Sequence, residues 1–533
     1  MLVEVTMPYH SHYVFLDCNQ IQQYIFSSYR LRGICGASLL LDEVERERIP
    51  KLCNGSLIRS GGGVVIAGFD SENGKIPEKF RKDAEKEYAR IGVPVTSLIF
   101  EPGDGSTSDF YIDVLKPMFN TMLQQKHNSQ SLHTNLSTIL AVPCENSGCE
   151  PAEHIAIPPW DSNPRRYSKI EATKVEYKRE KFDLELELET KFSGFKIPRD
   201  FTGIIAWNRE NISKDDLAEA SDDKGLGIIY ADVNGLGNLG KIFGKSQTLY
   251  HEFCNDIRET LLSSVFEGLA NILTETIKEK FAGKTPPSKA GLPLKILYIG
   301  GDDLAIAVKG TYALPFIVNI LEEFKKQSKQ LLKRMGENEM IRGLPEYLTM
   351  SAGVVLAPFD YPIQSFNRLG KALEERAKLF GKSLEKDGIK PSLVDFCMIK
   401  NNAMGSLGTV RENKTVLDNN DRVELLLYGG PYNLQETRTL LKKAKDLTEM
   451  SFPNNKINGL RSILAKSTPN ARKDYKKWRK SLTEVELKLF DEILGALGCN
   501  DPDIPQRQPY SFSYRSTPIL DLIELMSLEK TNH

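Results

Sequence analysis

An internal repeat constrains the fold of this chain more than any other feature. In both copies, an apolar run ends in Asp-x-Asn, and a helical segment, a Gly-Gly hairpin, an amphipathic helix and another apolar run follow. The opening runs end at residues 17–19 and 232–234. This succession predicts strands and helices in the order β-α-β-β-α-β, which is the ferredoxin-like order. The chain is therefore predicted to be an α+β protein with two such domains.

The hairpin of the second copy, "ILYIGGDDLAIAV" (residues 296–308), places Asp302 and Asp303 side by side within an apolar run. Adjacent carboxylates repel one another unless a cation compensates them. In the ferredoxin-like order the first strand lies beside the hairpin, so we expect Asp232 to face both. Gly-Gly-Asp-Asp alone also suits a polar turn, but the repeat and Asp232 favour a metal site. We predict Asp232, Asp302 and Asp303 as catalytic residues and metal ligands, with the Val233 carbonyl as a further ligand.

Three converging carboxylates are what a two-metal phosphoryl-transfer site requires, with Mg²⁺ or Mn²⁺ as the two ions. In the first copy, "IRSGGGVVIAG", Gly63 and Val64 stand at the positions of Asp302 and Asp303. The first copy therefore keeps Asp17 but lacks the acidic hairpin. We expect one catalytic and one degenerate domain.

A literal G-x-G-x-x-G at residues 235–240 also admits a dinucleotide-binding or P-loop interpretation. The P-loop pattern has Ile242 where Ser or Thr would bind magnesium, and the dinucleotide pattern lacks a second strand ending in an acid. Residues 246–273 follow instead, with an apolar stripe typical of one long helix. The glycines more plausibly let a nucleotide approach the backbone.

Downstream, "SFNRLGKALEERAKLFGKS" predicts a helix with Lys371 and Lys378 seven residues apart, on one face. Exposed lysines are usually only solvated, but after a strand of a metal-binding domain they can reach polyphosphate as point charges. The predicted nucleotide-binding residues are Asn234, Gly235, Gly300, Gly301, Lys371 and Lys378.

Composition limits the other possibilities. The 533 residues suggest three or four domains, and the 70 Lys and Arg nearly cancel the 71 Asp and Glu, so no global field favours nucleic acid or lipid. The N-terminal segment lacks a signal-peptide pattern, and no apolar run approaches the length of a membrane span. The eight cysteines suit a reducing compartment. We expect a cytoplasmic protein.

The motifs "LRGICGASLLLDEV", "GIIYADVNGLG", "YIGGDD", "SAGVV" and "KALEERAK", taken in this order, resemble the large subunit of type III CRISPR effector complexes. This is the paired-palm cyclic oligoadenylate synthase family. The resemblance implies that the second palm is active and that ATP is joined 3′ to 5′ and cyclised. It also implies that Asp232, Asp302 and Asp303 bind metal and that Lys378 contacts the triphosphate.

The resemblance gives an expected division into a degenerate first palm, an inter-palm linker domain, a catalytic palm and a C-terminal helical domain. The predicted ranges are 1–115, 116–205, 206–400 and 401–533.

Two features depart from the family pattern. The chain contains no His-Asp dipeptide, so DNA cleavage by a histidine-aspartate nuclease is not expected. Only one cysteine pair, Cys144 and Cys149, lies between the predicted palms, with His154 nearby. Structural zinc normally takes four ligands, so zinc is not expected.

The sequence thus predicts a nucleotidyltransferase that joins ATP into cyclic oligoadenylates. Its expected partners are CRISPR effector subunits with guide RNA and target RNA. Two alternatives stay open. One is a stand-alone cyclic dinucleotide synthase of the diguanylate cyclase type, for which a homo-oligomer is expected; the other is a non-catalytic scaffold subunit that binds RNA.

Overall fold

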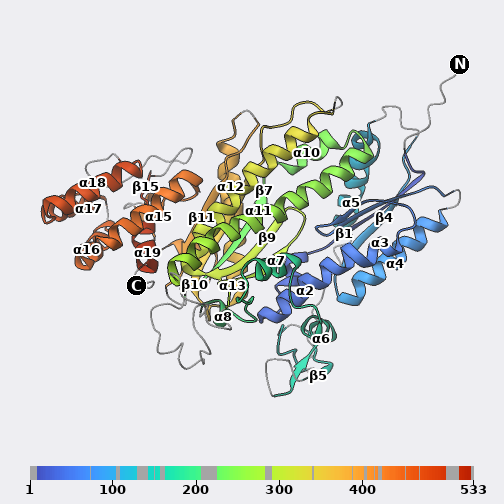
Figure 1. Cartoon of the computed structure of the whole chain (residues 1–533), viewed down its shortest axis with the longest axis horizontal. Helices are drawn as coiled ribbons and strands as arrows, with labels where there is room; N and C mark the ends of the chain where they lie inside the picture. The colour runs from blue at the N-terminus through green and yellow to red at the C-terminus, as the bar shows by residue number, and fades with distance from the viewer. Residues whose placement is uncertain are drawn as a thin grey trace.

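A computed structural model gives the fold of the chain (Figure 1). The residues that it describes are 9–71, 74–103, 109–128, 142–148, 150–156, 163–205, 225–281, 291–338, 341–386, 388–400, 405–412, 414–417, 423–450, 452–466, 468–499 and 515–529. Figure 1 shows one palm at the right in blue, the other in the middle in green and yellow, and the C-terminal helices at the left in orange and red. Within the described ranges, no helix is long and apolar enough to cross a membrane.

The first palm is a four-stranded sheet in the order β2-β3-β1-β4, with every neighbouring pair antiparallel. This is the predicted ferredoxin-like order. The strands are β1 (His12–Cys18), β2 (Ser56–Gly61), β3 (Val64–Phe69) and β4 (Val95–Phe100). The helical segments are α1 (Ile21–Ile25), α2 (Leu31–Glu43), the π-helical turn η1 (Val44–Arg48), α3 (Ile49–Leu52) and α4 (Lys75–Ile91).

The second palm repeats this order and extends it. Its sheet runs β14-β11-β10-β7-β9-β8, so the repeated unit is β10-β7-β9-β8 and β11 adds in parallel beside β10. The strands are β7 (Gly225–Val233), β8 (Leu294–Ile299), β9 (Asp303–Lys309), β10 (Met350–Pro358) and β11 (Leu393–Met398). The helices are α10 (Leu236–Phe243), α11 (Gln247–Phe281), α12 (Gly310–Met335) and α13 (Ile363–Ser383).

The long helix α11 confirms the interpretation of the stripe after the glycine motif. Its apolar residues at four-residue spacing are all buried, as a helix packed along a sheet requires. They are Leu249, Phe253, Ile257, Leu261, Val265 and Leu269.

The segment between the palms holds η2 (Tyr111–Leu115), α5 (Lys116–Asn128), β5 (His154–Ala156), β6 (Arg165–Tyr167), α6 (Lys169–Glu176), α7 (Asp183–Lys191) and α8 (Phe201–Ile205). The predicted boundary at residue 115 falls between η2 and α5, which follow one another without a break. Met118 and Met122 of α5 are buried in the core of the first palm. Of the predicted cysteine pair, Cys144 is buried with a free thiol, and Cys149 lies outside the described residues.

The C-terminal part contains the predicted helices and also a small sheet, β12-β13-β15. Its elements are α14 (Leu407–Glu412), β12 (Thr415–Leu417), β13 (Val423–Leu426), β14 (Tyr432–Asn433), α15 (Leu434–Glu449), α16 (Asn454–Leu464), α17 (Thr468–Lys480), α18 (Glu484–Ala496), β15 (Arg515–Ser516) and α19 (Ile519–Glu529). Strand β14 pairs with β11, so this part is joined to the sheet of the second palm.

The two palms share a hydrophobic core. One cluster of buried side chains contains Val14 and Leu16 of β1 together with Tyr230 of β7 and Ala305 of β9. The rings of Phe26 and Tyr230 pack with centroids 6.0 Å apart. Burial of apolar surface from both palms in one core fixes how they face each other.

Candidate active site

Asp232 and Asp303 face each other across two paired strands. Asp232 is the penultimate residue of β7, Asp303 is the first residue of β9, and the antiparallel register makes them direct partners. Asp302 precedes Asp303 in the turn of the hairpin, where its carbonyl accepts a hydrogen bond from the Val233 N–H at 3.2 Å. The structure therefore brings the three predicted carboxylates to one end of the sheet, next to Val233.

Burial and the neighbouring carboxylates raise the pKa values of Asp232 and Asp302 at this end of the sheet. Burial, the hydrogen bond to Asp303 and the charge of Asp303 together raise the pKa of Asp232 to about 8. Burial and the charge of Asp303 also raise the pKa of Asp302. A raised pKa means that the surroundings disfavour the ionised carboxylate, and additional positive charge beside it relieves this cost. The site is thus arranged to receive positive charge.

Two lysines of α13 supply part of that charge, as their spacing predicted. Lys378 forms an ion pair with Asp232, and the Lys371 Nζ lies 3.9 Å from Asp303 Oδ1. Glu374, which is not among the predicted site residues, joins them: its carboxylate lies 2.8 Å from Lys371 and 3.2 Å from Lys378. Burial lowers the pKa of Lys378, but Asp232 and Glu374 raise it overall. The sequence could have predicted the contact of Glu374 with both lysines, because residues 371, 374 and 378 are three and four positions apart and share one helix face.

The donor set fits a divalent cation. The oxygens are hard carboxylate donors, and Asp303 Oδ1 is buried without a hydrogen-bond partner. Across the described residues, no group of three or more His, Cys, Asp or Glu side chains is already gathered to hold an ion. Asp232 is instead paired with Lys378, while Asp302 lines the neighbouring cavity. An ion would replace the ammonium group as the partner of Asp232 and draw in the carboxylate of Asp302.

The remaining predicted residues differ in their surroundings. The Asn234 amide is engaged within the protein: it donates to Thr349 Oγ1 at 3.0 Å and accepts from Ser351 Oγ at 2.9 Å. Asn234 therefore links the end of β7 to β10. No sequence pattern predicted Thr349 and Ser351 as its partners. Gly235 has a φ of 81°, and open space surrounds the position of a Cβ there, so its backbone is accessible.

The acidic hairpin at residues 300–303 contains two glycines with different surroundings. A Cβ at Gly300 would stand 1.9 Å from the Tyr298 hydroxyl, which leaves no room for a side chain. At Gly301 the close neighbour is Gly62 of the first palm, because a Cβ on Gly62 would lie 3.2 Å from the Gly301 nitrogen. The hairpins of the two palms thus meet through glycine backbones.

The first palm shows the same register without the acidic pair. Asp17 on β1 is the direct partner of Val64 on β3, as Asp232 is of Asp303. Its carboxylate forms an ion pair with Lys126 of α5 at 2.7 Å. The remaining aspartate of the first palm is therefore neutralised by a lysine of the segment that follows it.

A cavity of about 340 Å³ opens between the palms beside Asp302. Its walls come from the β2 hairpin end of the first palm, from η2 and α5, from α10 and α11, and from the acidic hairpin. Gly237 and Gly240 of α10 line it, with open space where their Cβ atoms would stand. The literal glycine motif thus borders a space between the two domains.

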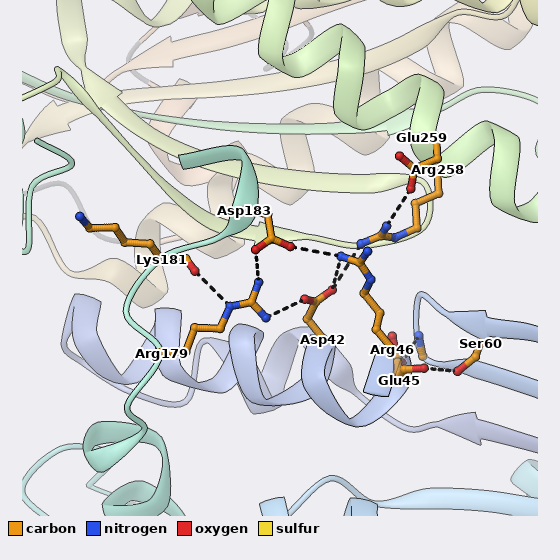
Figure 2. Close-up of polar contacts among 10 residues, drawn as sticks. Asp42, Glu45, Arg46, Ser60, Arg179, Lys181, Asp183, Arg258 and Glu259 are labelled. Carbon is orange, nitrogen blue, oxygen red and sulfur yellow. Dashed lines mark hydrogen bonds and ion pairs between the residues drawn. The ribbon is translucent and has the colours of Figure 1, made fainter. Parts of the chain in front are cut away.

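An ion-pair network behind this cavity connects both palms with the segment between them (Figure 2). The Asp42 carboxylate of α2 faces three guanidinium groups, at 3.9 Å from Arg46, 3.4 Å from Arg179 and 3.3 Å from Arg258. Arg258 of α11 also contacts Glu259 at 3.4 Å and lines the inter-palm cavity. Asp42 is thus the common partner of cations from three parts of the chain.

Comparison with known families bears on the second palm. Residues 225–389 match the family model of the Cas10/Cmr2 second palm domain. The second palm is of the Cas10/Cmr2 type. The matched segment contains the three aspartates and both lysines of the site. No curated protein matches the chain.

One solved structure resembles this chain in its fold. The structure titled "Type III-B Cmr-beta Cryo-EM structure of the Apo state" has a TM-score of 0.52 at 9% identity, with 98% of this chain and 82% of that chain covered. At this identity the likeness concerns the fold alone. Structures of the Csm1-Csm4 cassette in complex with cA4 and with cA3 both give a TM-score of 0.48 at 13% identity. The match to the cA4 structure covers 98% of this chain and 69% of that chain. The match to the cA3 structure covers 99% of this chain and 71% of that chain.

Proposed function

We propose that the chain is a subunit of a type III CRISPR complex that joins ATP into cyclic oligoadenylates. The observation that carries the proposal is the pairing of Asp232 with Asp303 beside Asp302, within a segment that matches the Cas10/Cmr2 second palm. The choice of adenine follows the family resemblance.

The proposed roles follow from the positions of the side chains. Asp232, Asp302 and Asp303 would hold two Mg²⁺ or Mn²⁺ ions, and the Val233 carbonyl is close enough in sequence to contribute. Bound divalent ions activate an attacking hydroxyl and stabilise the charge on a leaving pyrophosphate. Lys378 and Lys371, released from their carboxylate partners, would contact the triphosphate as point charges.

Glu374 keeps the two lysines extended towards the sheet, because both ammonium groups lie within ion-pair distance of its buried carboxylate. Gly235, Gly300 and Gly301 leave the backbone free for close approach of a nucleotide. These contributions position the reactants, which is a large part of the rate acceleration in phosphoryl transfer.

The test is incubation of the protein with each labelled NTP and Mn²⁺, followed by mass spectrometry of the products. The reactions are run with the protein alone and with a guide-RNA complex bound to target RNA. Cyclic adenylate products that form mainly in the presence of the RNA complex are expected. Cyclic guanylates from pure protein would instead support a diguanylate-type enzyme, and no product in any reaction would support a scaffold subunit.

A further inference from the structure

Arg59 of the first palm lies in the inter-palm cavity with Asp302 and Gly301 of the second. It sits near the end of β2, where the register with β3 shifts between Leu57 and Arg59. The neighbouring Ile58 is buried in the core of the first palm. The irregular strand therefore keeps an apolar side chain in the core while the arginine reaches the cavity.

The guanidinium of Arg59 has few partners. Its Nη1 donates to the Tyr250 hydroxyl at 3.4 Å, which is a long hydrogen bond. Within the described residues, no carboxylate oxygen lies within 4.0 Å of it. A guanidinium carries five N–H donors in a planar fork that matches carboxylate or phosphate. A half-buried cation with this much unused donor capacity favours binding of an anion.

The other cations of the cavity differ from Arg59. Arg258 is already held by Asp42 and Glu259, as Figure 2 shows, and Lys116 is exposed at the wall. The charged residues that line the cavity are the cations Arg59, Lys116 and Arg258 and the single carboxylate of Asp302. With Arg258 paired, Arg59 and Lys116 face the single carboxylate of Asp302, so the cavity keeps one excess positive charge. Its size of about 340 Å³ suits a nucleotide.

We propose that Arg59 of the first palm contacts the phosphates of the nucleoside triphosphate on which the second palm acts. The inference rests on the proposed function and adds a substrate contact from the palm that lacks the acidic hairpin. The nucleotide site is then composite, since carboxylates and lysines come from one palm and a phosphate-binding arginine from the other.

The experiment compares Arg59→Gln and Arg59→Lys with wild type in the full chain. Calorimetric titrations use a non-hydrolysable ATP analogue and adenosine, both with Mg²⁺. Loss of a charge-assisted contact to phosphate is expected to weaken binding of the ATP analogue about ten- to hundredfold. Adenosine should bind all three proteins equally, and Arg59→Lys should recover part of the affinity. Steady-state assays should show the loss mainly as a higher KM.

Arg81→Gln is the matched control, because Arg81 also belongs to the first palm but pairs with Glu78 and Glu85 on the surface of α4. It should bind the ATP analogue as wild type does. Equal loss of adenosine and ATP-analogue binding in Arg59→Gln would indicate a structural role and overturn the inference. So would wild-type affinity for the analogue.

The titrations also separate this inference from the proposed function. Suppose that the wild type makes no product from any NTP, while Arg59→Gln binds the ATP analogue more weakly than the wild type does. The proposed function then fails and the Arg59 contact stands. If products form and Arg59→Gln keeps both its affinity and its KM, the proposed function stands and the Arg59 contact fails.

Discussion

Asp303→Asn tests whether the carboxylate cluster exists to hold cations. The substitution keeps the shape of the side chain and its ability to bond to Asp232, but it removes one negative charge. In the wild type the pKa of Asp232 is raised from 3.8 to about 8, first by burial and then by its hydrogen bond to Asp303 and the Asp303 charge. Burial persists in the variant, so only the contribution of Asp303 is relieved.

The sign and size of the effect follow from linkage. A carboxyl group whose pKa is raised in the folded state costs no stability below its ordinary pKa, and the cost grows as pH rises through 4 to about 8. Each unit by which the pKa of Asp232 falls in the variant corresponds to about 1.4 kcal/mol, present in full at about pH 8 and above. In metal-free buffer at pH 8.5, Asp303→Asn should therefore be more stable than wild type, with a smaller difference at pH 5.

Amide hydrogen exchange of β7 and β9 measures this free energy locally, which suits a chain of several domains. Addition of Mn²⁺ should slow exchange in wild type much more than in Asp303→Asn. Product formation should fall at least a thousandfold, because loss of a metal ligand raises the barrier by several kcal/mol and each ~1.4 kcal/mol is a factor of ten.

Asp17→Asn in the first palm is the control. Its part-exposed ion pair with Lys126 is worth less than about 1 kcal/mol, so the variant should be slightly less stable than wild type at neutral pH, with no change in its response to Mn²⁺. A less stable Asp303→Asn in metal-free buffer, or an unchanged response of that variant to Mn²⁺, would refute the reasoning.

Three further substitutions test other parts of the site. Gly62→Ala should lower product formation, because its φ is 64° and its Cβ would lie 3.2 Å from the Gly301 nitrogen of the acidic hairpin. The control Gly343→Ala, with a φ of 77° and open space around the Cβ, should keep full activity. Lys378→Gln removes the partner of Asp232, so the pKa of Asp232 should rise and the acidic limb of the pH–rate profile should move to higher pH. Asp42→Asn leaves guanidinium groups without their shared carboxylate and should lower the free energy of unfolding by roughly 1–3 kcal/mol in urea titrations. The control Asp256→Asn, on α11, the helix that also carries Arg258, breaks an exposed ion pair with Arg334. It should lower the free energy of unfolding by under about 1 kcal/mol.

The repeat made the fold and the carboxylate pair predictable. In a β-α-β-β-α-β unit the first strand must lie beside the hairpin, so the place of Asp232 opposite Asp303 follows from chain order and strand register. The two lysines were predictable because helix periodicity puts them on one face.

Contacts that depend on the packing of one domain on another had no such signal. The bonds of Arg59 to Tyr250 and of Asp42 to Arg258 join residues 191 and 216 positions apart, and no periodicity encodes them. The same holds for α5: its Met118 and Met122 complete the core of the first palm, beyond the boundary expected at residue 115. The amide of Asn234 was expected at the nucleotide, but it bonds to Ser351 because the neighbouring strand offers a buried hydroxyl.

Two opposite sides of helix α13 make different polar contacts. One presents Lys371 and Lys378 to the carboxylates, while Arg376 points to the other side and binds the buried Asp395 of β11 at 2.6 Å and the Gly430 carbonyl at 2.8 Å. Arg411 of α14 holds the same carboxylate at 2.9 Å. Breaking a buried pair of this kind costs several kcal/mol. The side of α13 that faces away from Lys371 and Lys378 is therefore anchored to β11, to α14 and to the Gly430 carbonyl, so the same helix carries the two lysines of the site and the attachment of the C-terminal segments.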